Sequence, residues 1–384
     1  MRTKFSLLAT AATAAVCLST GSAAGAAPDG PSGRDAGDAA PVLLTAGLVG
    51  PLHVSAGRDG SVTVSESFAG RLTRVDPKGN KDVLYESPDW NVAGNDRRDD
   101  RTYFLESQGA GPHPAELAGH VRIIDDDDGR QRTLGDFAAL ETKENSDGET
   151  RYGFRHLPEG CEAKLPANMP ASYKGEVDSH PYGIAVTEET IYVADAGANS
   201  VVSVDTRSGE TKTVAVLPPR PYKITPAAAA SNGLPGCVVG TTYDFEAVPT
   251  DVAVGPDGWL YITSLPGGPE DPALGARGAV FKVDPDGEKV KLVADDIMTP
   301  TGLALGEKGE LYVASLFGGG VLRIDPDSDE RTVVLEAGFA ADVDLRGGTL
   351  YATVNALPGP DGEPDGQVMY LNLRDGRHDG ATGS

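Results

Sequence analysis

His180-Pro-Tyr-Gly-Ile-Ala-Val186, Thr190-Ile-Tyr-Val-Ala-Asp195 and Val201-Val-Ser-Val-Asp205 together form the three-strand unit that decides the fold. Apolar and polar residues alternate within each run, and a turn separates each run from the next, as in antiparallel strands. The same unit returns at Pro249-Thr-Asp-Val-Ala-Val254 and at Pro300-Thr-Gly-Leu-Ala-Leu305, each followed by its own second and third runs. The chain therefore repeats one supersecondary unit.

The number of units indicates how the repeat closes. Another clear copy opens at Pro51-Leu-His-Val-Ser-Ala56, and weaker copies lie around residues 102–125 and 340–373. A repeat of roughly 40 residues with about four short strands is typical of a propeller blade. The last unit supplies only three strands, so we expect Val42-Leu-Leu-Thr-Ala-Gly-Leu48 to pair with it and remove the open sheet edges. The sequence predicts an all-β, six-bladed β-propeller of four-stranded blades, as one domain over residues 42–376.

The N-terminal residues have a different composition. Arg2 and Lys4 precede an apolar stretch over residues 5–18, and small residues follow through Ala26. This pattern predicts a secretory signal peptide over residues 1–26. Its apolar part is too short for a membrane-spanning helix, and no later stretch reaches the roughly 20 apolar residues that a span needs. We expect a secreted protein with no membrane span, with a flexible leader over residues 27–41 and a flexible tail over residues 377–384.

The charge of the chain narrows the classes of partner. Its formal net charge is −24 at pH 7, and cleavage of the signal peptide would remove two basic residues. Such a charge argues against nucleic acid and anionic membranes as partners. It keeps an exported protein soluble, or it attracts cations, and the sequence leaves both roles open.

Cys161 and Cys237 are the two cysteines beyond the signal peptide, and each lies in a long insertion between units. The insertions cover residues 140–179 and 218–248, and both join an outer strand to the next inner strand, so they share one face of a propeller. Export permits a disulfide. We therefore expect a disulfide between Cys161 and Cys237, with two free thiols as the alternative.

Loop lengths distinguish the two faces of the predicted ring. Tight turns such as Pro256-Asp-Gly258 lie on one side, and the Asp-Pro-Asp segments at Asp284 and Asp325 are typical of such turns rather than of calcium loops. The long connections lie on the other side, over residues 107–120, 140–179, 218–248, 266–278 and 356–366. Long loops in a compact domain are usually functional or disordered. We expect the long-loop face to bind a small molecule, a glycan or an extracellular protein.

Polar residues are expected to converge at the channel mouth on the same face. Alignment of the units places polar residues at the ends of second strands and at the starts of inner strands. The predicted channel-mouth residues are Glu66, Glu106, Asp195, Asn355, Asp251, Asp342, His53 and His180. Their carboxylates could bind Ca²⁺ or another divalent cation, or could hydrogen-bond the backbone of neighbouring blades and seal the ring. Both interpretations remain open.

No catalytic motif accompanies these residues. The sequence has no Gly-x-Ser-x-Gly elbow, no P-loop, no dinucleotide fingerprint after a strand and no Cys/His zinc spacing. It therefore predicts no catalytic residue and no certain cofactor.

Several motifs resemble a known family. Gly183-Ile-Ala-Val186 with Ile191-Tyr-Val-Ala-Asp195 resembles the NHL repeat. Asp178-Ser-His-Pro-Tyr-Gly183, Leu234-Pro-Gly-Cys-Val238 and Glu246-Ala-Val-Pro-Thr-Asp-Val252 resemble the ScyD/ScyE family of exported, NHL-like propellers. The resemblance implies a propeller fold and export, but no established chemistry, so it supports a binding scaffold without naming a ligand.

A more distant resemblance suggests an enzyme. Six-bladed lactonases similar to SMP-30 and gluconolactonase hold one divalent metal with a Glu, an Asn and an Asp at the channel mouth. The positions that match their Asn-Gly and Asp-Gly pairs are Tyr182 and Thr301, while Asp251 and Asp342 fall one residue later. The alternative is therefore a metal-dependent lactonase or hydrolase with a rearranged ligand set: Glu66, Glu106, Asp251 and Asp342, with His53 or His180 as base.

Overall fold

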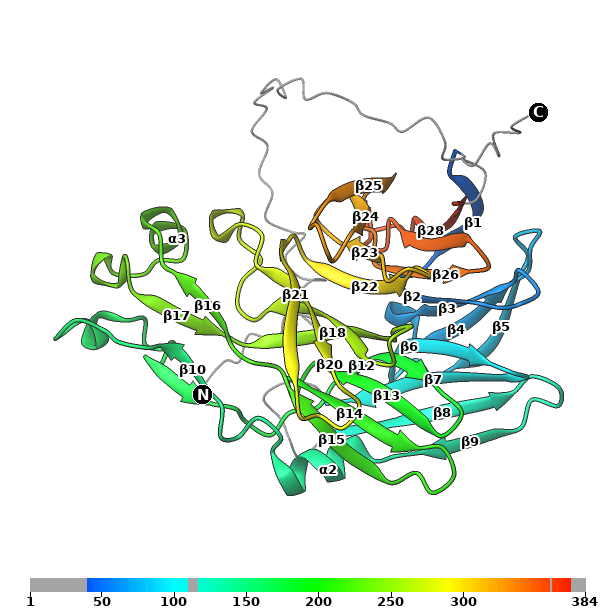
Figure 1. Cartoon of the computed structure of the whole chain (residues 1–384), viewed down its shortest axis with the longest axis horizontal. Helices are drawn as coiled ribbons and strands as arrows, with labels where there is room; N and C mark the ends of the chain where they lie inside the picture. The colour runs from blue at the N-terminus through cyan, green and yellow to red at the C-terminus, as the bar shows by residue number, and fades with distance from the viewer. Residues whose placement is uncertain (1–39, 110–116, 360, 374–384) are drawn as a thin grey trace, which may run out of the picture.

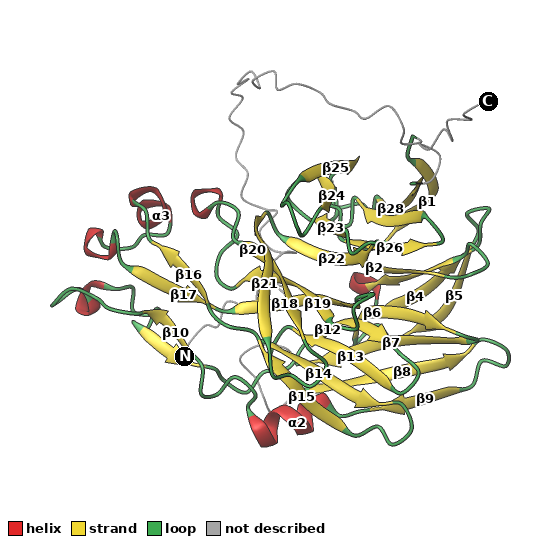
Figure 2. Ribbon diagram, in the orientation of Figure 1, coloured by secondary structure: helices red, strands yellow, loops and turns green. Residues whose placement is uncertain are grey.

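The computed structural model describes residues 40–109, 117–359 and 361–373. Within this part of the chain, seven four-stranded antiparallel sheets and two α-helices form the fold (Figures 1 and 2). The expected signal peptide, nearly all of the leader and the polar tail lie outside the described residues. No helix among the described residues is long and apolar enough to cross a membrane.

Five sheets each use four consecutive strands of the chain, with the first strand innermost. They are β2 (Pro51–Ala56), β3 (Val62–Glu66), β4 (Arg71–Val75) and β5 (Lys81–Glu86); β6 (Asn91–Arg98), β7 (Arg101–Gln108), β8 (Ala118–Asp125) and β9 (Gln131–Leu134); β12 (Pro181–Val186), β13 (Thr190–Asp195), β14 (Ser200–Asp205) and β15 (Thr211–Val216); β18 (Ala247–Val254), β19 (Leu260–Pro266), β20 (Gly278–Val283) and β21 (Val290–Ile297); and β22 (Pro300–Leu305), β23 (Leu311–Ser315), β24 (Gly320–Ile324) and β25 (Arg331–Glu336). The repeating unit of the sequence is thus a sheet.

The sixth sheet joins the two ends of the described chain. It contains β26 (Asp342–Arg346), β27 (Thr349–Val354) and β28 (Gly366–Asn372), and its outer strand is β1 (Val42–Leu48). β1 runs antiparallel to β28, with Val42 opposite Tyr370 and Leu48 opposite Gly366. This is the pairing that the sequence predicts, and it covers the edge of β28 that would otherwise be exposed.

The inner strands of these six sheets contact one another in a closed cycle. β2 contacts β6, β6 contacts β12, β12 contacts β18, β18 contacts β22, β22 contacts β26, and β26 returns to β2. Apolar clusters fill the spaces between successive sheets. Ile191 and Val193 of β13, for example, pack with Leu105 of β7 and Ile123 of β8. A ring of sheets packed face to face in this way is a β-propeller.

The seventh sheet departs from the expected set of six. It contains β11 (Ser172–Lys174), β10 (Arg151–Phe154), β17 (Thr242–Phe245) and β16 (Arg220–Lys223), in that order. Both long insertions contribute to it, because β10 pairs with β17 across about 90 residues of sequence. Figure 1 shows β10, β16 and β17 projecting to the left of the ring. We call this four-stranded element the insertion sheet.

Short helices occur in the same insertions. The helix α2 (Phe137–Glu144) is capped at its N-terminus by Asp136, whose side chain accepts a hydrogen bond from Ala139 N. Its C-terminal cap is Asn145, which adopts a left-handed conformation. α3 (Pro226–Ser231) begins after Thr225, which caps Ala228 N. Ser, Thr, Asp and Asn favour such N-terminal positions because they satisfy backbone donors that the helix leaves free.

Candidate functional site

Carboxylates link the inner strands of neighbouring sheets near the ring axis. In each case the side chain accepts a hydrogen bond from a backbone N–H of the next sheet. The bonds run from Val186 N to Asp96 (2.8 Å), from Leu303 N to Asp251 (2.8 Å), from Val54 N to Asp342 (2.7 Å) and from Ala56 N to Asp344 (2.7 Å). Three alternate junctions of the ring are therefore joined by aspartates, because these bonds connect β6 with β12, β18 with β22, and β26 with β2.

Burial changes the acid strength of these aspartates. Desolvation raises the pKa of Asp251 to about 8, although backbone donors at Leu303 and Val252 oppose the shift. Desolvation also raises the pKa of Asp342, and the nearby charge of Asp251 adds to the shift. A raised pKa favours the protonated acid, which costs less to bury than a charged group.

Two histidines and a tyrosine lie beside this pair. His53 Nδ1 is 3.9 Å from Asp342 Oδ2, and the His53 ring meets the Tyr182 ring edge-on with centroids 4.4 Å apart. His180 meets the same tyrosine at 5.8 Å. Burial lowers the pKa of His53 to about 3, with a further contribution from His180, and lowers the pKa of His180 to about 4. Both imidazoles are therefore neutral at pH 7, and Nε2 of each is buried without a hydrogen-bond partner.

Glu66 is the last residue of β3 and Glu106 lies two residues before the end of β7, and each carboxylate has its own local partners. Glu66 accepts from Arg71 Nε at 2.9 Å and Nη2 at 2.8 Å, and from Val49 N at 2.7 Å. Glu106 lies 2.6 Å from His120 Nε2 and accepts from Tyr85 Oη at 2.6 Å. Burial alone would raise the pKa of both glutamates. Hydrogen bonds from Arg71 to Glu66 and from His120 to Glu106 outweigh the effect of burial, so both pKa values lie below the usual value for Glu.

Asp195 and Asn355 complete the predicted channel-mouth set. Asp195 accepts hydrogen bonds from His180 N at 2.7 Å and from Ser179 Oγ at 2.6 Å. It therefore fixes the segment immediately before β12, which carries His180. Asn355 donates to Asp365 at 3.2 Å in a more exposed loop. The structure thus brings together His53, Asp342 and Asp251, and it ties the other predicted carboxylates to local partners.

These partners bear on the proposed metal-ligand set. Within the residues that the structure describes, no group of three or more His, Cys, Asp or Glu side chains is arranged to hold a metal ion. Asp251 and Asp342 each accept two backbone hydrogen bonds, and Glu66 forms a two-point ion pair with Arg71. Their oxygens would have to exchange these partners before they could bind a divalent cation, so the geometry described here does not fit that set.

A cavity lies beside the insertion sheet, on the long-loop face. It has a volume of about 430 Å³ and is bounded by the insertion sheet, by the insertion segments around it and by loops of the β12–β15 and β18–β21 sheets. His180 lines it, so the cavity approaches the channel-mouth residues. The remaining lining residues that matter for its chemistry are Tyr173, Tyr243, Phe245, Glu176, Asp178 and Glu246.

The insertion sheet supplies the aromatic wall. Tyr152 pairs with Tyr173, Phe154 with Tyr243, and Tyr243 with Tyr222, so these rings share one face of the sheet. The opposite face carries polar residues such as Arg155 and Asp244, which form an ion pair at 2.7 Å. The period of two in these short strands therefore gives the sheet an apolar side and a solvent side.

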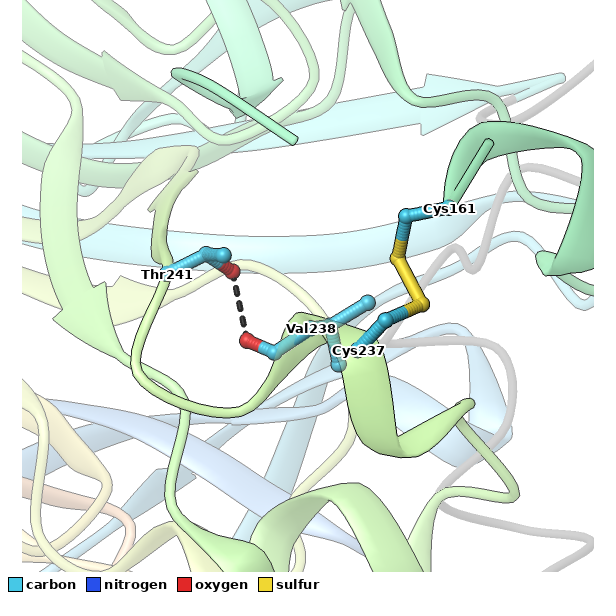
Figure 3. Close-up of a disulfide and its surroundings, with 4 residues drawn as sticks. All are labelled: Cys161, Cys237, Val238 and Thr241. Atoms are coloured by element: carbon cyan, nitrogen blue, oxygen red, sulfur yellow. Dashed lines mark hydrogen bonds between the residues drawn. A yellow bond between two sulfur atoms is a disulfide. The ribbon is translucent and has the colours of Figure 1, made fainter. Parts of the chain in front are cut away.

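The two insertions that contribute lining residues to the cavity are covalently joined. Cys161 and Cys237 form a disulfide between the two insertions, as expected, with their Cα atoms 5.9 Å apart (Figure 3). Beside it, Thr241 Oγ1 donates to Val238 O at 2.6 Å and closes the turn that follows Cys237 (Figure 3).

Arg277 lies behind the cavity lining and holds one of the loops that form it. Its guanidinium lies 4.4 Å from the centre of the Phe245 ring and donates to the carbonyls of Gly267 and Pro269. The loop that carries these carbonyls lines the cavity. A buried cation therefore holds the loop against the aromatic wall.

Sequence reasoning did not find the insertion sheet, the cavity residues other than His180, or the linking role of Asp96 and Asp344, and it named Tyr182 only as a position that matches a lactonase residue. Two signals were present. Arg151-Tyr-Gly-Phe154 and Thr242-Tyr-Asp-Phe245 both place aromatic residues two apart, which is the strand period. The spacing from Asp342 to Asp344 likewise places both carboxylates on one face of β26.

Comparisons with known proteins give the fold and no family. No family model matches the chain, and no curated protein matches it. Among solved structures, the PQQ-bound aldose sugar dehydrogenase of Streptomyces coelicolor matches with a TM-score of 0.52 and 16% identity, over 86% of this chain and 96% of the other. A gluconolactonase of Xanthomonas campestris matches with a TM-score of 0.51 and 15% identity, over 86% and 88%. A putative glucose dehydrogenase of Thermus thermophilus matches at 0.52 and 16%, over 86% and 99%. At these identities the likeness extends to the propeller fold alone.

Proposed function

We propose that the chain is an exported, six-bladed β-propeller of the ScyD/ScyE type that binds a small molecule in the cavity beside the insertion sheet. The observation that carries the proposal is the cavity itself, which has aromatic and aliphatic walls and a few polar groups. Ligand sites in proteins are typically concave, of this size and of this mixed composition. In this proposal the ring is the scaffold and the insertions form the binding element.

The packing of the inner strands supports a count of six blades. Six inner strands contact one another in a cycle, and no strand of the insertion sheet takes part in that cycle among the described residues. We therefore assign the insertion sheet as an addition to a ring of six blades.

Export is supported by the N-terminal sequence and by the disulfide. Disulfides persist in oxidising compartments and are rare in reducing ones. The bond between Cys161 and Cys237 joins segments that both border the cavity, so an oxidising environment would also favour the binding-competent form.

The proposal is tested by a chemically diverse ligand screen against the folded protein, read as a rise in the thermal unfolding midpoint and confirmed by titration calorimetry. A ligand that binds only the folded state raises the midpoint by mass action. Hits should lose affinity in Tyr243→Leu, which alters the cavity wall, and keep it in Tyr312→Leu, a buried tyrosine on β23 outside the cavity lining. Hits that respond equally to both variants, or a screen without saturable binding, would refute the proposal. Binding of only a glycan or a protein would reassign the face to that partner.

A metal-dependent lactonase or hydrolase is the second candidate. The observation in its favour is the buried cluster of His53, Asp342 and Asp251, in which Nε2 of His53 has no partner. The test is the thermal midpoint in chelator, then with calcium, magnesium, manganese and zinc in turn, followed by a panel of lactones. A metal-specific rise that Asp251→Ala and Glu106→Ala abolish, with turnover that chelator removes, would support this candidate. No rise at millimolar metal would exclude it.

A further inference from the structure

We propose that the ligand of the cavity is an organic cation: an amine or ammonium group attached to a hydrocarbon body. This inference rests on the proposed binding function and adds the chemical class of the ligand. Four features of the cavity support it, namely the sign of its charged groups, its aromatic wall, a protein cation already bound to that wall, and its aliphatic lining.

The charged groups that line the cavity all have the same sign. Glu176, Asp178 and Glu246 contribute carboxylates, and neither Lys nor Arg is among the lining residues. Asp178 is only 6% exposed, so its interaction with a ligand would be weakly screened by water. His180 also lines the cavity, and its imidazole is neutral at pH 7 because burial lowers its pKa to about 4. It therefore does not offset the carboxylates.

The aromatic wall attracts the same kind of group. Tyr243 and Phe245 pack with ring centroids 4.6 Å apart, and both line the cavity together with Tyr173. The face of an aromatic ring is electronegative, so a cation placed over it is stabilised, most strongly where water is excluded. Glu246 accepts a hydrogen bond from Tyr173 and so places a carboxylate at the edge of this aromatic group.

The protein already places a cation of its own on this wall. The guanidinium of Arg277 lies 4.4 Å from the Phe245 centroid and 5.9 Å from that of Tyr222, and the residue is only 8% exposed. Arg277 is not itself a lining residue. The wall thus tolerates a desolvated cation beside Phe245, and the same chemistry is available to a ligand at Tyr173 and Tyr243.

The remaining lining indicates the size and polarity of the ligand. Ile224, Leu234, Leu265 and Leu274 present aliphatic surface, and the cavity holds about 430 Å³. A simple metal ion or a small ammonium ion would leave most of this surface in contact with water. An amine with a body of one or two rings would bury it.

The experiment compares three ligands that share a naphthalene ring with a two-carbon side chain and differ in charge. They are the cation of 2-(1-naphthyl)ethylamine, neutral 2-(1-naphthyl)ethanol and the carboxylate anion of 1-naphthaleneacetic acid. Titration calorimetry on the oxidised protein at low salt should show the amine binding at least ten-fold more tightly than the alcohol, and the carboxylate more weakly than either. Added salt should lower the affinity for the amine and leave the affinity for the alcohol unchanged, because of these two only the amine interacts through charge.

Variants assign the effect to the cavity. Glu246→Gln keeps the side-chain shape and should reduce affinity for the amine at least five-fold, with little change for the alcohol. Glu162→Gln removes the same charge from an exposed position of the other insertion, over residues 140–179, and should change neither. If the alcohol or the carboxylate binds as tightly as the amine, and Tyr243→Leu weakens that binding, the cavity binds ligands but the cationic class is wrong. If other compounds occupy the cavity and none of the three ligands does, the cationic class is also wrong. If no compound occupies the cavity, the proposed function itself fails.

Discussion

The backbone N–H of Val54 donates to Asp342 Oδ2 at 2.7 Å, although the two residues are 288 positions apart. The bond crosses from β26 to β2, where the last sheet of the ring meets the first. Asp344 repeats the arrangement one pleat further along with Ala56, also at 2.7 Å. Ring closure therefore has two components, the pairing of β1 with β28 at the outside and this aspartate pair at the axis.

The first prediction concerns the inner component of ring closure. Asp342→Ala leaves two buried donors, Val54 N and Val343 N, without their acceptor. Each buried donor without a partner costs about 1–3 kcal/mol, so we expect the free energy of unfolding to fall by about 2–6 kcal/mol. Urea unfolding measures the change. Asp286→Ala, in an exposed turn, is the control and should stay within about 0.5 kcal/mol of wild type. Equal effects at both positions would show that Asp342 does not act as a closure contact.

The second prediction concerns the disulfide. Replacing Cys161 and Cys237 together by serine should loosen the insertion sheet and the insertion segments beside the cavity, because the bond restricts the freedom of both insertions. The chain-entropy model gives about 4.5 kcal/mol for the 76 residues that separate the two cysteines. Hydrogen exchange should rise in β10, β11, β16 and β17 and stay unchanged in β13 and β19, which lie within the ring. Faster exchange across all sheets would instead indicate that the ring depends on the insertions.

The propeller could be predicted from the sequence because its strands repeat. Each inner strand carries the same alternation, and Val42–Leu48 was the one unassigned strand that could complete the last sheet. The disulfide was accessible for a related reason, since a propeller places both insertions on one face. These are consequences of periodicity and topology, which local sequence encodes.

The insertion sheet and the cavity could not be predicted in the same way. β10 and β17 have four residues each and find each other across two long insertions, so no repeat marks their pairing. The positions of Asp251 and Asp342 were predictable, but the choice between metal and backbone as their partner was not. That choice depends on which amides of the neighbouring strand face them, and only the packed ring determines it.

The third prediction follows from the depressed pKa of His53. Below pH 6.5 the unfolded chain takes up a proton on this histidine, whereas the folded protein does not until about pH 3. The histidine therefore destabilises the fold increasingly as pH falls, by about 1.4 kcal/mol per pH unit. His53→Gln removes this effect, so between pH 6.5 and pH 4.5 the stability of wild type relative to the variant should fall by roughly 2–3 kcal/mol.

Comparison with a variant is needed because Asp251 acts in the opposite direction. Its raised pKa stabilises the fold below about pH 4 and loses that contribution as pH rises toward 8. The wild-type profile alone would mix the two effects. His156→Gln, at an exposed position, is the matched control and should run parallel to wild type. A parallel profile for His53→Gln as well would show that His53 has the same pKa in the folded protein as in the unfolded chain.

The fourth prediction concerns how closely the inner strands approach. A Cβ atom added at Gly302 would lie 2.2 Å from Asp342 Oδ1 and 2.5 Å from Asp342 Cα, closer than real Cβ contacts allow. β22 and β26 would have to separate, so we expect Gly302→Ala to lower the free energy of unfolding by about 1–3 kcal/mol or more. Urea unfolding of Gly302→Ala against Gly236→Ala measures this, since Gly236 has open space around its own added Cβ. The Gly236 variant should be neutral or more stable by up to about 1 kcal/mol.

A double variant separates the two contacts at Gly302. Removing the Asp342 side chain as well relieves the clash with Oδ1 but leaves the clash with Cα, which belongs to the backbone of β26. Gly302→Ala should therefore cost less in the Asp342→Ala background than in wild type, but should still cost something, as a double-mutant cycle measures. If Gly302→Ala costs nothing in that background, the constraint lies in the side chain alone. A remaining cost would show that backbone approach at the axis requires glycine on β22, independently of the aspartate it faces.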